Sequence, residues 1–195
     1  EERDVSQSSA NHVYQTIKNE ATTKILDVSD NAEQLLMNIQ KFNPDVIFNC
    51  LHGYFGEDGQ IQSILNYLKI PYTHSGVLTS AILMNKIISK KLFQSLGIRS
   101  PEFLSEYNIN NKKLKFPLII KPVNGGSSYG LIKVNNKEFL IKYLNKKKIK
   151  KCEMLIEEFI FGRELTVGIL ENKICGVMEI KFSEELYDYN NKYIN

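Results

Sequence analysis

Residues 116–130 read FPLIIKPVNGGSSYG, and this stretch decides the fold. The apolar run 118–120 is typical of a buried strand, and it ends at Lys121, which a proline follows. Two glycines and two serines come next, before a second apolar run at 131–134. A lysine at a strand end supplies a positive charge, and glycines let backbone N–H groups approach an anion closely. The pattern therefore predicts a phosphate-binding loop between two strands.

This loop differs from the Walker A loop, in which the lysine follows the glycines and opens a helix. Here the lysine precedes the glycines and a strand follows them. Glycine and serine are also ordinary turn residues. On these residues alone, a glycine-rich β-hairpin with an exposed Lys121 is therefore an open alternative.

The composition is that of an ordinary soluble globular protein. The 195 residues are 43% hydrophobic and 24% charged, which allows one large or two small domains. A net charge of +3 does not favour nucleic-acid binding, and the lysine cluster at 146–151 is more typical of a solvated helix end. No apolar run approaches the roughly 20 residues that span a bilayer, and no signal-peptide pattern opens the sequence. We expect a cytoplasmic protein that binds neither nucleic acid nor membrane.

Three cysteines, Cys50, Cys152 and Cys175, lie far apart, each in or beside an apolar stretch. Their spacing fits no metal site. The sequence therefore predicts reduced thiols in the core of a cytosolic protein.

The first half of the chain alternates between strand and helix patterns. It has predicted strands at 24–28 and 45–51, and predicted helices at 31–42 and 61–68. Alternation of this kind predicts an open parallel sheet whose ligands gather at the carboxyl ends of the strands. The loop that begins at His52 lies at such an end.

The second half changes to an antiparallel pattern and is predicted to be α+β. A single long helix is expected at 80–96, closed by Gly97. After it come predicted strands at 117–121, 130–134, 154–159, 164–170 and 174–180, with a helix at 137–144.

Seven motifs stand in a fixed order along the chain, and together they resemble the D-alanine–D-alanine ligases of the ATP-grasp superfamily. They are EERDVS at 1–6, LHGYFGEDGQIQ at 51–62, PYTHSGV at 71–77, MNKIISK at 84–90, KPVNGGSSYG at 121–130, IEEFIFGRELTV at 156–167 and YDYNNKY at 187–193. Together the seven motifs cover essentially the whole chain. HGxxGEDG and YDYxxKY are specific to these ligases rather than general to the superfamily.

The resemblance implies a fold that combines α/β and α+β parts. An N-terminal open parallel-sheet domain, the pre-ATP-grasp domain, is expected at 1–80. An ATP-grasp domain follows that is incomplete at its C-terminus. Its central subdomain is expected at 81–158, and the start of its C-terminal subdomain, with a lid loop, at 159–195.

The resemblance also implies an activity, which is the ATP-dependent ligation of two D-alanines through an acyl phosphate. The dipeptide serves peptidoglycan synthesis, and with it cell wall biogenesis and cell shape. The partners implied are ATP, two molecules of D-alanine, Mg²⁺ or Mn²⁺, and a second copy of the chain in a cytoplasmic homodimer.

Seven residues match the family's ATP-binding residues. Lys86, Lys121 and Ser128 match groups near the phosphates. Glu157 matches the carboxylate beside the adenine amino group, and Phe159 and Ile160 match the backbone near the edge of the base. Glu164 matches the acid that binds the ribose hydroxyls. From the residues alone, Lys86 could be a solvent-facing helix lysine, Glu157 an edge-strand charge and Glu164 half of a surface pair.

Four residues match the amino-acid side of the family's site. Glu2 matches the glutamate that holds the ammonium of the first D-alanine, and His52 the histidine near its carboxylate. Ser127 matches the serine that links Glu2 to a lid tyrosine, which corresponds to Tyr193. A tyrosine there favours the dipeptide ligase over relatives that use D-lactate. Without the motif, His52 could equally be a turn or capping residue.

The sequence departs from the family pattern at both ends. The family has a strand before EERDVS, and it continues well past YDYxxKY with the phosphoryl-stabilising arginine and the Mg²⁺ ligands. No metal ligand is therefore expected in this chain, and the chain alone is expected to be inactive. Two alternatives stay open, which are a truncated, inactive ligase remnant and another ATP-grasp carboxylate–amine ligase.

Overall fold

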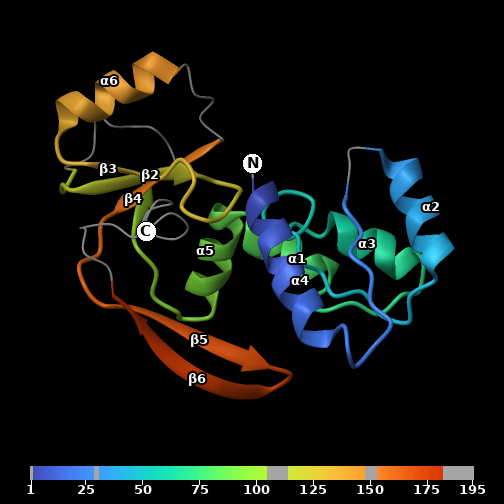
Figure 1. Cartoon of the computed structure of the whole chain (residues 1–195). Helices are drawn as coiled ribbons and strands as arrows, with labels where there is room; N and C mark the ends of the chain where they lie inside the picture. The colour runs from blue at the N-terminus through green and yellow to red at the C-terminus, as the bar shows by residue number, and fades with distance from the viewer. Residues whose placement is uncertain (1, 29–30, 105–113, 148–152, 182–195) are drawn as a thin grey trace. The chain divides into compact units, whose positions relative to one another are not determined.

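The structure is a computed structural model that describes residues 2–28, 31–104, 114–147 and 153–181 (Figure 1). The chain forms two compact units. Unit 1 comprises Glu1–Ser89 with Asn124–Gly126, and unit 2 comprises Lys90–Val123 with Ser127–Asn195. The division of the sequence at residues 80 and 158 stays a prediction.

The described part of unit 1 contains four complete helices, which are α1 (Arg3–Ile17), α2 (Ala32–Phe42), α3 (Gln60–Tyr67) and α4 (Val77–Met84). Its core is made where α2 meets α3, because Leu35, Ile39, Ile61 and Leu65 are all buried there. The predicted helices at 31–42 and 61–68 are therefore confirmed as amphipathic elements with buried apolar faces. Asn31 caps α2 by accepting a hydrogen bond from the backbone N–H of Gln34 at 3.0 Å.

The strands predicted at 24–28 and 45–51 do not form as regular strands. One parallel bridge, Ile47↔Tyr72, is present in the described part of unit 1, so the parallel direction is confirmed at that point. Beyond it, side chains bond the backbone where a ladder would. The N–H of Asn49 donates to Thr73 Oγ1 at 3.0 Å, and the N–H of Leu51 donates to Asn49 Oδ1 at 3.1 Å. These bonds satisfy the backbone without a neighbouring strand.

The single helix predicted at 80–96 is wrong, because the chain forms two helices, α4 and α5 (Lys86–Ser95). Asn85 separates them with an extended backbone (φ −89°, ψ 102°). Its Oδ1 accepts from the N–H groups of Ile87 and Ile88, both at 3.1 Å. Asparagine is a strong N-cap residue, so it starts a new helix inside a continuous apolar pattern.

Gly97 ends α5 as predicted. Its φ is +71°, and the N–H of Ile98 reaches back to the carbonyl of Phe93 at 2.9 Å. This is the left-handed C-terminal arrangement that glycine favours.

Unit 2 is built on a four-stranded antiparallel sheet with the order β1-β4-β2-β3. Its strands are β1 (Phe103–Leu104), β2 (Leu118–Pro122), β3 (Ile132–Val134) and β4 (Met154–Glu158). Helix α6 (Lys137–Lys147) covers one face of this sheet (Figure 1). There Leu118, Ile120, Val134 and Ile156 form a buried cluster with Leu140 of α6. The antiparallel prediction is confirmed, whereas the two-residue strand β1 was not predicted, because it is too short to show alternation.

The alternation of side chains along β2 puts Lys121 on the face of the sheet away from this cluster. Leu118 and Ile120 point toward α6, so Ile119 and Lys121 point the other way. Ile119 pairs directly with Glu157 of β4. Lys121 and Glu157 therefore share one face as diagonal neighbours.

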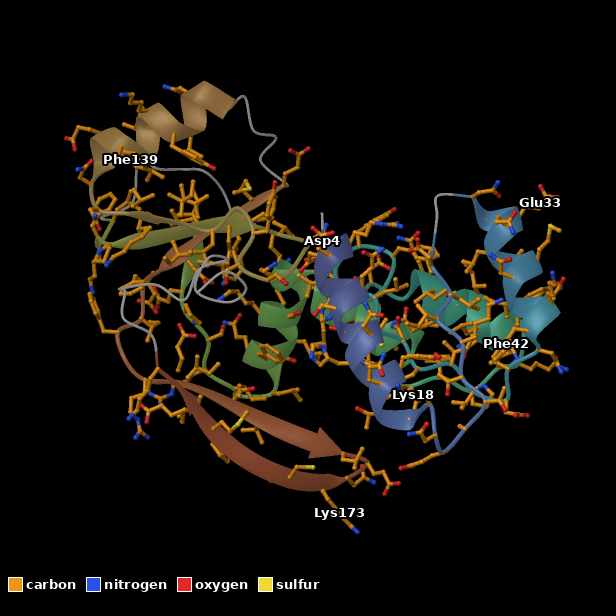
Figure 2. The ribbon with its side chains drawn as sticks, viewed as in Figure 1. Asp4, Lys18, Glu33, Phe42, Phe139 and Lys173 are labelled. Atoms are coloured by element: carbon orange, nitrogen blue, oxygen red, sulfur yellow. The ribbon has the colours of Figure 1, made fainter. Side chains whose placement is uncertain are left out.

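A separate two-stranded sheet follows, formed by β5 (Glu164–Leu170) and β6 (Lys173–Ile180). Figure 2 shows Lys173 at the turn of this hairpin. Almost all of its residues are exposed, including Cys175. The prediction of a core thiol is therefore wrong for Cys175, because the hairpin has no covered face among the described residues. Cys50 is partly buried, and Cys152 lies outside the described residues.

Candidate functional site

The glycine loop has an unusual backbone between β2 and β3. Ser127 and Ser128 both have positive φ values, +50° and +57°, and Gly125 has φ +107°. Two successive non-glycine residues in the left-handed region are strained, and such strain is found preferentially at ligand sites. Successive N–H groups in conformations of this kind can form an anion-binding concavity. The predicted strand–loop–strand arrangement is confirmed, and its backbone suits a phosphate.

Lys121 does not face solvent freely. Its Nζ pairs with Oε1 of Glu157, and the other carboxylate oxygen, Oε2, lies 2.7 Å from Nζ of Lys90 in α5. The buried Glu157 Oε2 has no hydrogen-bond partner among the described residues, and its contact with Lys90 is an ion pair. One carboxylate is thus held between two lysines, and the alternatives of an exposed lysine and an edge-strand charge do not hold for these residues.

Lys86 is the first residue of α5, and its ammonium is also engaged. Its Nζ donates to the carbonyl of Gly125 at 2.7 Å. The N–H of the same glycine lies 3.1 Å from Met84 Sδ. The alternative of a purely solvent-facing helix lysine is therefore wrong, because Lys86 contacts the tip of the predicted phosphate loop.

The segment after β4 is predicted to line the adenine. The N–H of Phe159 donates to the carbonyl of Pro117 at 3.2 Å. The Phe159 ring packs edge-to-face against the Phe161 ring, with 4.7 Å between the two ring centroids. Lys133 Nζ lies 4.4 Å from the centre of the Phe159 ring. By contrast, Ile160 and Glu164 are exposed, so their predicted contacts with adenine and ribose stay predictions.

Unit 1 holds a second cluster around Glu2, which precedes α1. The carboxylate of Glu2 lies directly against Gly53, at the place where any side chain on that residue would begin. The N–H of Gly53 donates to Glu57 Oε2 at 2.6 Å. A Cβ on Gly126 would lie 3.8 Å from Glu2 Oε1 and 3.9 Å from Glu57 Oε2, so the two carboxylates converge on one spot.

This cluster has an unsatisfied acceptor. Glu2 Oε1 is buried and has no hydrogen-bond partner among the residues that the structure describes. A buried carboxylate oxygen without a partner is costly unless a cation or donor occupies the place beside it. The arrangement therefore suits a small cationic group.

His52 lies against α1 beside this cluster. Its N–H donates to Ser6 Oγ at 3.0 Å, and its Nε2 is 3.0 Å from Ser9 Oγ. His52, Ser9 and Glu57 line a pocket of about 240 Å³, which also includes Cys50. Burial raises the pKa of the Cys50 thiol above its usual value, so this thiol stays uncharged at neutral pH.

Residues within and beside the HGYFGEDGQ motif at 52–60 hold the loop in shape. The side-chain amides of Asn49 and Gln62 both donate to the carbonyl of Gly56, at 2.9 and 2.7 Å. Asp58 accepts from the N–H groups of Phe55 and Gln60. Only His52 and Glu57 of this motif are left to face the pocket.

Sequence reasoning missed two residues of these clusters, Glu57 and Lys90. Both stand inside recognised motifs, HGYFGEDG and MNKIISK. A charged residue within a motif was a usable signal for each, but only the fold shows that Glu57 faces the same spot as Glu2 and that Lys90 is buried.

Comparison with known proteins identifies the family. The sequence model of the D-ala D-ala ligase C-terminus matches residues 92–195, and that of the D-ala D-ala ligase N-terminus matches residues 24–75. The chain belongs to the D-alanine–D-alanine ligase family.

Individual members of the family agree with this assignment. The chain is 46% identical over 176 residues to a D-alanine–D-alanine ligase of Pelagibacter ubique, an alignment that covers 85% of this chain and 57% of the relative. It is 39% identical over 197 residues to a ligase of the same name from Wolbachia pipientis, covering 98% of this chain and 61% of the relative. The chain thus spans less than two thirds of the length of these curated relatives.

Solved structures of D-alanine–D-alanine ligases confirm the predicted ATP-grasp fold. The crystal structure of the ligase from Bacillus anthracis matches with a TM-score of 0.76 at 33% identity, covering 97% of this chain and 64% of the other. A structure of that ligase complexed with ATP matches with a TM-score of 0.72 at 31% identity, covering 95% and 64%.

The predicted lid tyrosine, Tyr193, and its motif at 187–193 lie outside the described residues. No group of three or more His, Cys, Asp or Glu side chains within the described ranges is arranged to hold a metal ion. In the same ranges, no helix combines the length and the apolar character that crossing a membrane requires.

Proposed function

We propose that the protein containing this chain is an ATP-dependent D-alanine–D-alanine ligase of peptidoglycan synthesis. In the proposed reaction, the carboxylate of one D-alanine takes the terminal phosphoryl group of ATP and becomes an acyl phosphate. The amine of a second D-alanine then attacks the acyl carbon and releases phosphate. Membership of the family supports this proposal, as do two clusters of charged residues that suit the two substrates.

The observation that carries the proposal is the carboxylate cluster of unit 1. Glu2 Oε1 is buried without a partner in the described part of the chain, and Glu57 Oε2 faces the same spot. Two carboxylates favour the ammonium of an amino acid by charge and by hydrogen bonding. We assign this spot to the ammonium of the first D-alanine, and we assign His52, in the adjoining pocket, to its carboxylate.

The nucleotide is assigned to residues of β2, β4 and the loops beside them. Lys121, Ser128 and Lys86 would hold phosphates, since phosphoryl transfer depends mainly on positioned positive charge and hydrogen-bond donors. Glu157, the backbone of Phe159 and Ile160, and Glu164 would hold adenine and ribose. The strained backbone of Ser127 and Ser128 supports a phosphate loop.

The remaining assignments follow the family alone. Ser127 would link Glu2 to Tyr193 on a lid. Mg²⁺ would neutralise the phosphates, and its ligands are not found among the described residues. A cytoplasmic homodimer is proposed on the same basis.

A ligation assay tests the proposal. A full-length protein that contains this chain is incubated with ATP, Mg²⁺ and D-alanine, and ADP and the dipeptide are measured together. We expect equal amounts of ADP and D-alanyl-D-alanine, and a large loss of both in Glu2→Gln, because an amide is a much weaker partner for an ammonium. Absence of ADP formation would support an inactive remnant, and ADP formation only with another amino acid would support a different carboxylate–amine ligase.

A further inference from the structure

We propose that Lys90 is a positioning residue for ATP binding. It keeps Glu157 neutralised, so that Lys121 can leave Glu157 and pair with the phosphates of the nucleotide. This inference rests on the proposed function, because it assumes that Lys121 meets a polyphosphate. It concerns a residue to which neither the motifs nor the comparisons assign a role.

The three charges differ in how firmly they are buried. The side chains of Lys90 and Glu157 are 8% and 5% exposed, whereas that of Lys121 is 23% exposed. Lys121 is therefore the partner with access to a ligand. Lys90 and Glu157 form the fixed pair of the three.

Other contacts hold Lys90 in place whether or not a ligand is bound. Its Nζ donates to the carbonyl of Pro101 at 2.8 Å and lies 5.8 Å from the centre of the Phe103 ring. Phe103 in turn pairs with Glu157 in the β1–β4 register. The ammonium is thus held by β1 and by Pro101, the residue before Glu102, beside the strand that carries the carboxylate.

Charge balance gives this arrangement its function. A buried carboxylate that loses its only cation carries a large desolvation penalty, so a lone Lys121 would be held by Glu157. With Lys90 present, Glu157 stays paired when Lys121 moves, and the cluster of two lysines and one carboxylate keeps one excess positive charge. That excess charge is what a polyphosphate attracts.

The test compares ATP with adenosine, which has the base and ribose but no phosphate. Lys90→Met removes the second cation, so Lys121 should remain with Glu157 and the phosphates should lose a partner. In a full-length protein containing this chain, calorimetric titration should show ATP affinity reduced on the order of tenfold, because one charge interaction with the phosphates is lost. The affinity for adenosine should change by less than about twofold.

Two further variants separate this role from a structural one. Lys91→Met removes an exposed lysine one position along α5, and both affinities should stay unchanged. The double variant Lys90→Met/Glu157→Gln carries an uncharged amide that needs no counter-cation. Its ratio of ATP to adenosine affinity should equal that of Glu157→Gln alone, and this comparison remains decisive if Lys90→Met by itself fails to fold.

The outcomes distinguish this inference from the proposed function. Equal losses for ATP and adenosine in Lys90→Met would make Lys90 merely structural and overturn the inference while leaving the ligase proposal intact. A ratio in the double variant well below that of Glu157→Gln would overturn it too. If the unaltered protein binds no ATP, both proposals fall.

Discussion

At the scale of single residues, the unit 1 site depends on an absent side chain. Gly53 has φ +73°, and the carboxylate of Glu2 occupies the space where a Cβ would lie. Its N–H meanwhile donates to Glu57. One glycine therefore brings both carboxylates to the same spot, which a residue with a side chain could not do without displacing Glu2.

Gly53→Ala should consequently impair the amino-acid site. We expect the KM for D-alanine to rise on the order of tenfold, about 1.4 kcal/mol of lost binding, with ATP affinity unchanged within about twofold. Steady-state kinetics with each substrate varied would measure both KM values.

Gly97→Ala is the matched control, because Gly97 has φ +71° but open space where a Cβ would lie. It should cost stability, on the order of 1–2 kcal/mol for a left-handed residue, and leave KM unchanged. Equal KM values in both variants would argue against the proposed ammonium site.

At the scale of elements, the helix break at Asn85 fixes where Lys86 begins α5. Asn85→Ala removes the acceptor for two N–H groups and should lower the free energy of unfolding by about 1 kcal/mol. Asn85→Asp keeps an acceptor oxygen and should retain the wild-type stability. Urea unfolding of the three proteins measures this. Identical stability of Asn85→Ala would mean that packing of the two helices, and not the cap, sets the break.

The elements also show what a sequence can predict. Strands with strictly local signals, such as the apolar run before Lys121 and the two strands of the β5–β6 hairpin, form within one residue of their predicted bounds. The failures arise where another interaction replaces the expected one. Asn85 caps a helix inside an apolar pattern, and side chains of Asn49 and Thr73 bond the backbone of the expected strand at 45–51.

The same distinction holds for the site residues. Motifs predicted Lys121, Glu157 and Glu2, and the structure gives each of them a specific charged or buried environment. Lys90 could not be assigned in this way, because its burial depends on Pro101, eleven residues away, and on Glu157 of β4, which lies far from it in the sequence. Long-range pairing of this kind leaves no local pattern.

At the scale of the whole molecule, the chain forms two units and spans less than two thirds of the length of its curated relatives. Unit 1 carries the carboxylate cluster proposed for the amino acid, and unit 2 carries the lysine–glutamate cluster proposed for the nucleotide. In the proposed reaction, the carboxylate of D-alanine is activated by phosphorylation with ATP.

Isotope transfer tests that claim most directly. D-alanine labelled with ¹⁸O at both carboxylate oxygens is supplied to a full-length protein containing this chain, with ATP and Mg²⁺, and the inorganic phosphate is analysed by mass spectrometry. When the second amine displaces an acyl phosphate, the bridging oxygen of the carboxylate leaves with the phosphate. We predict one ¹⁸O in each phosphate released. Phosphate that forms together with the dipeptide but contains no ¹⁸O would contradict the account.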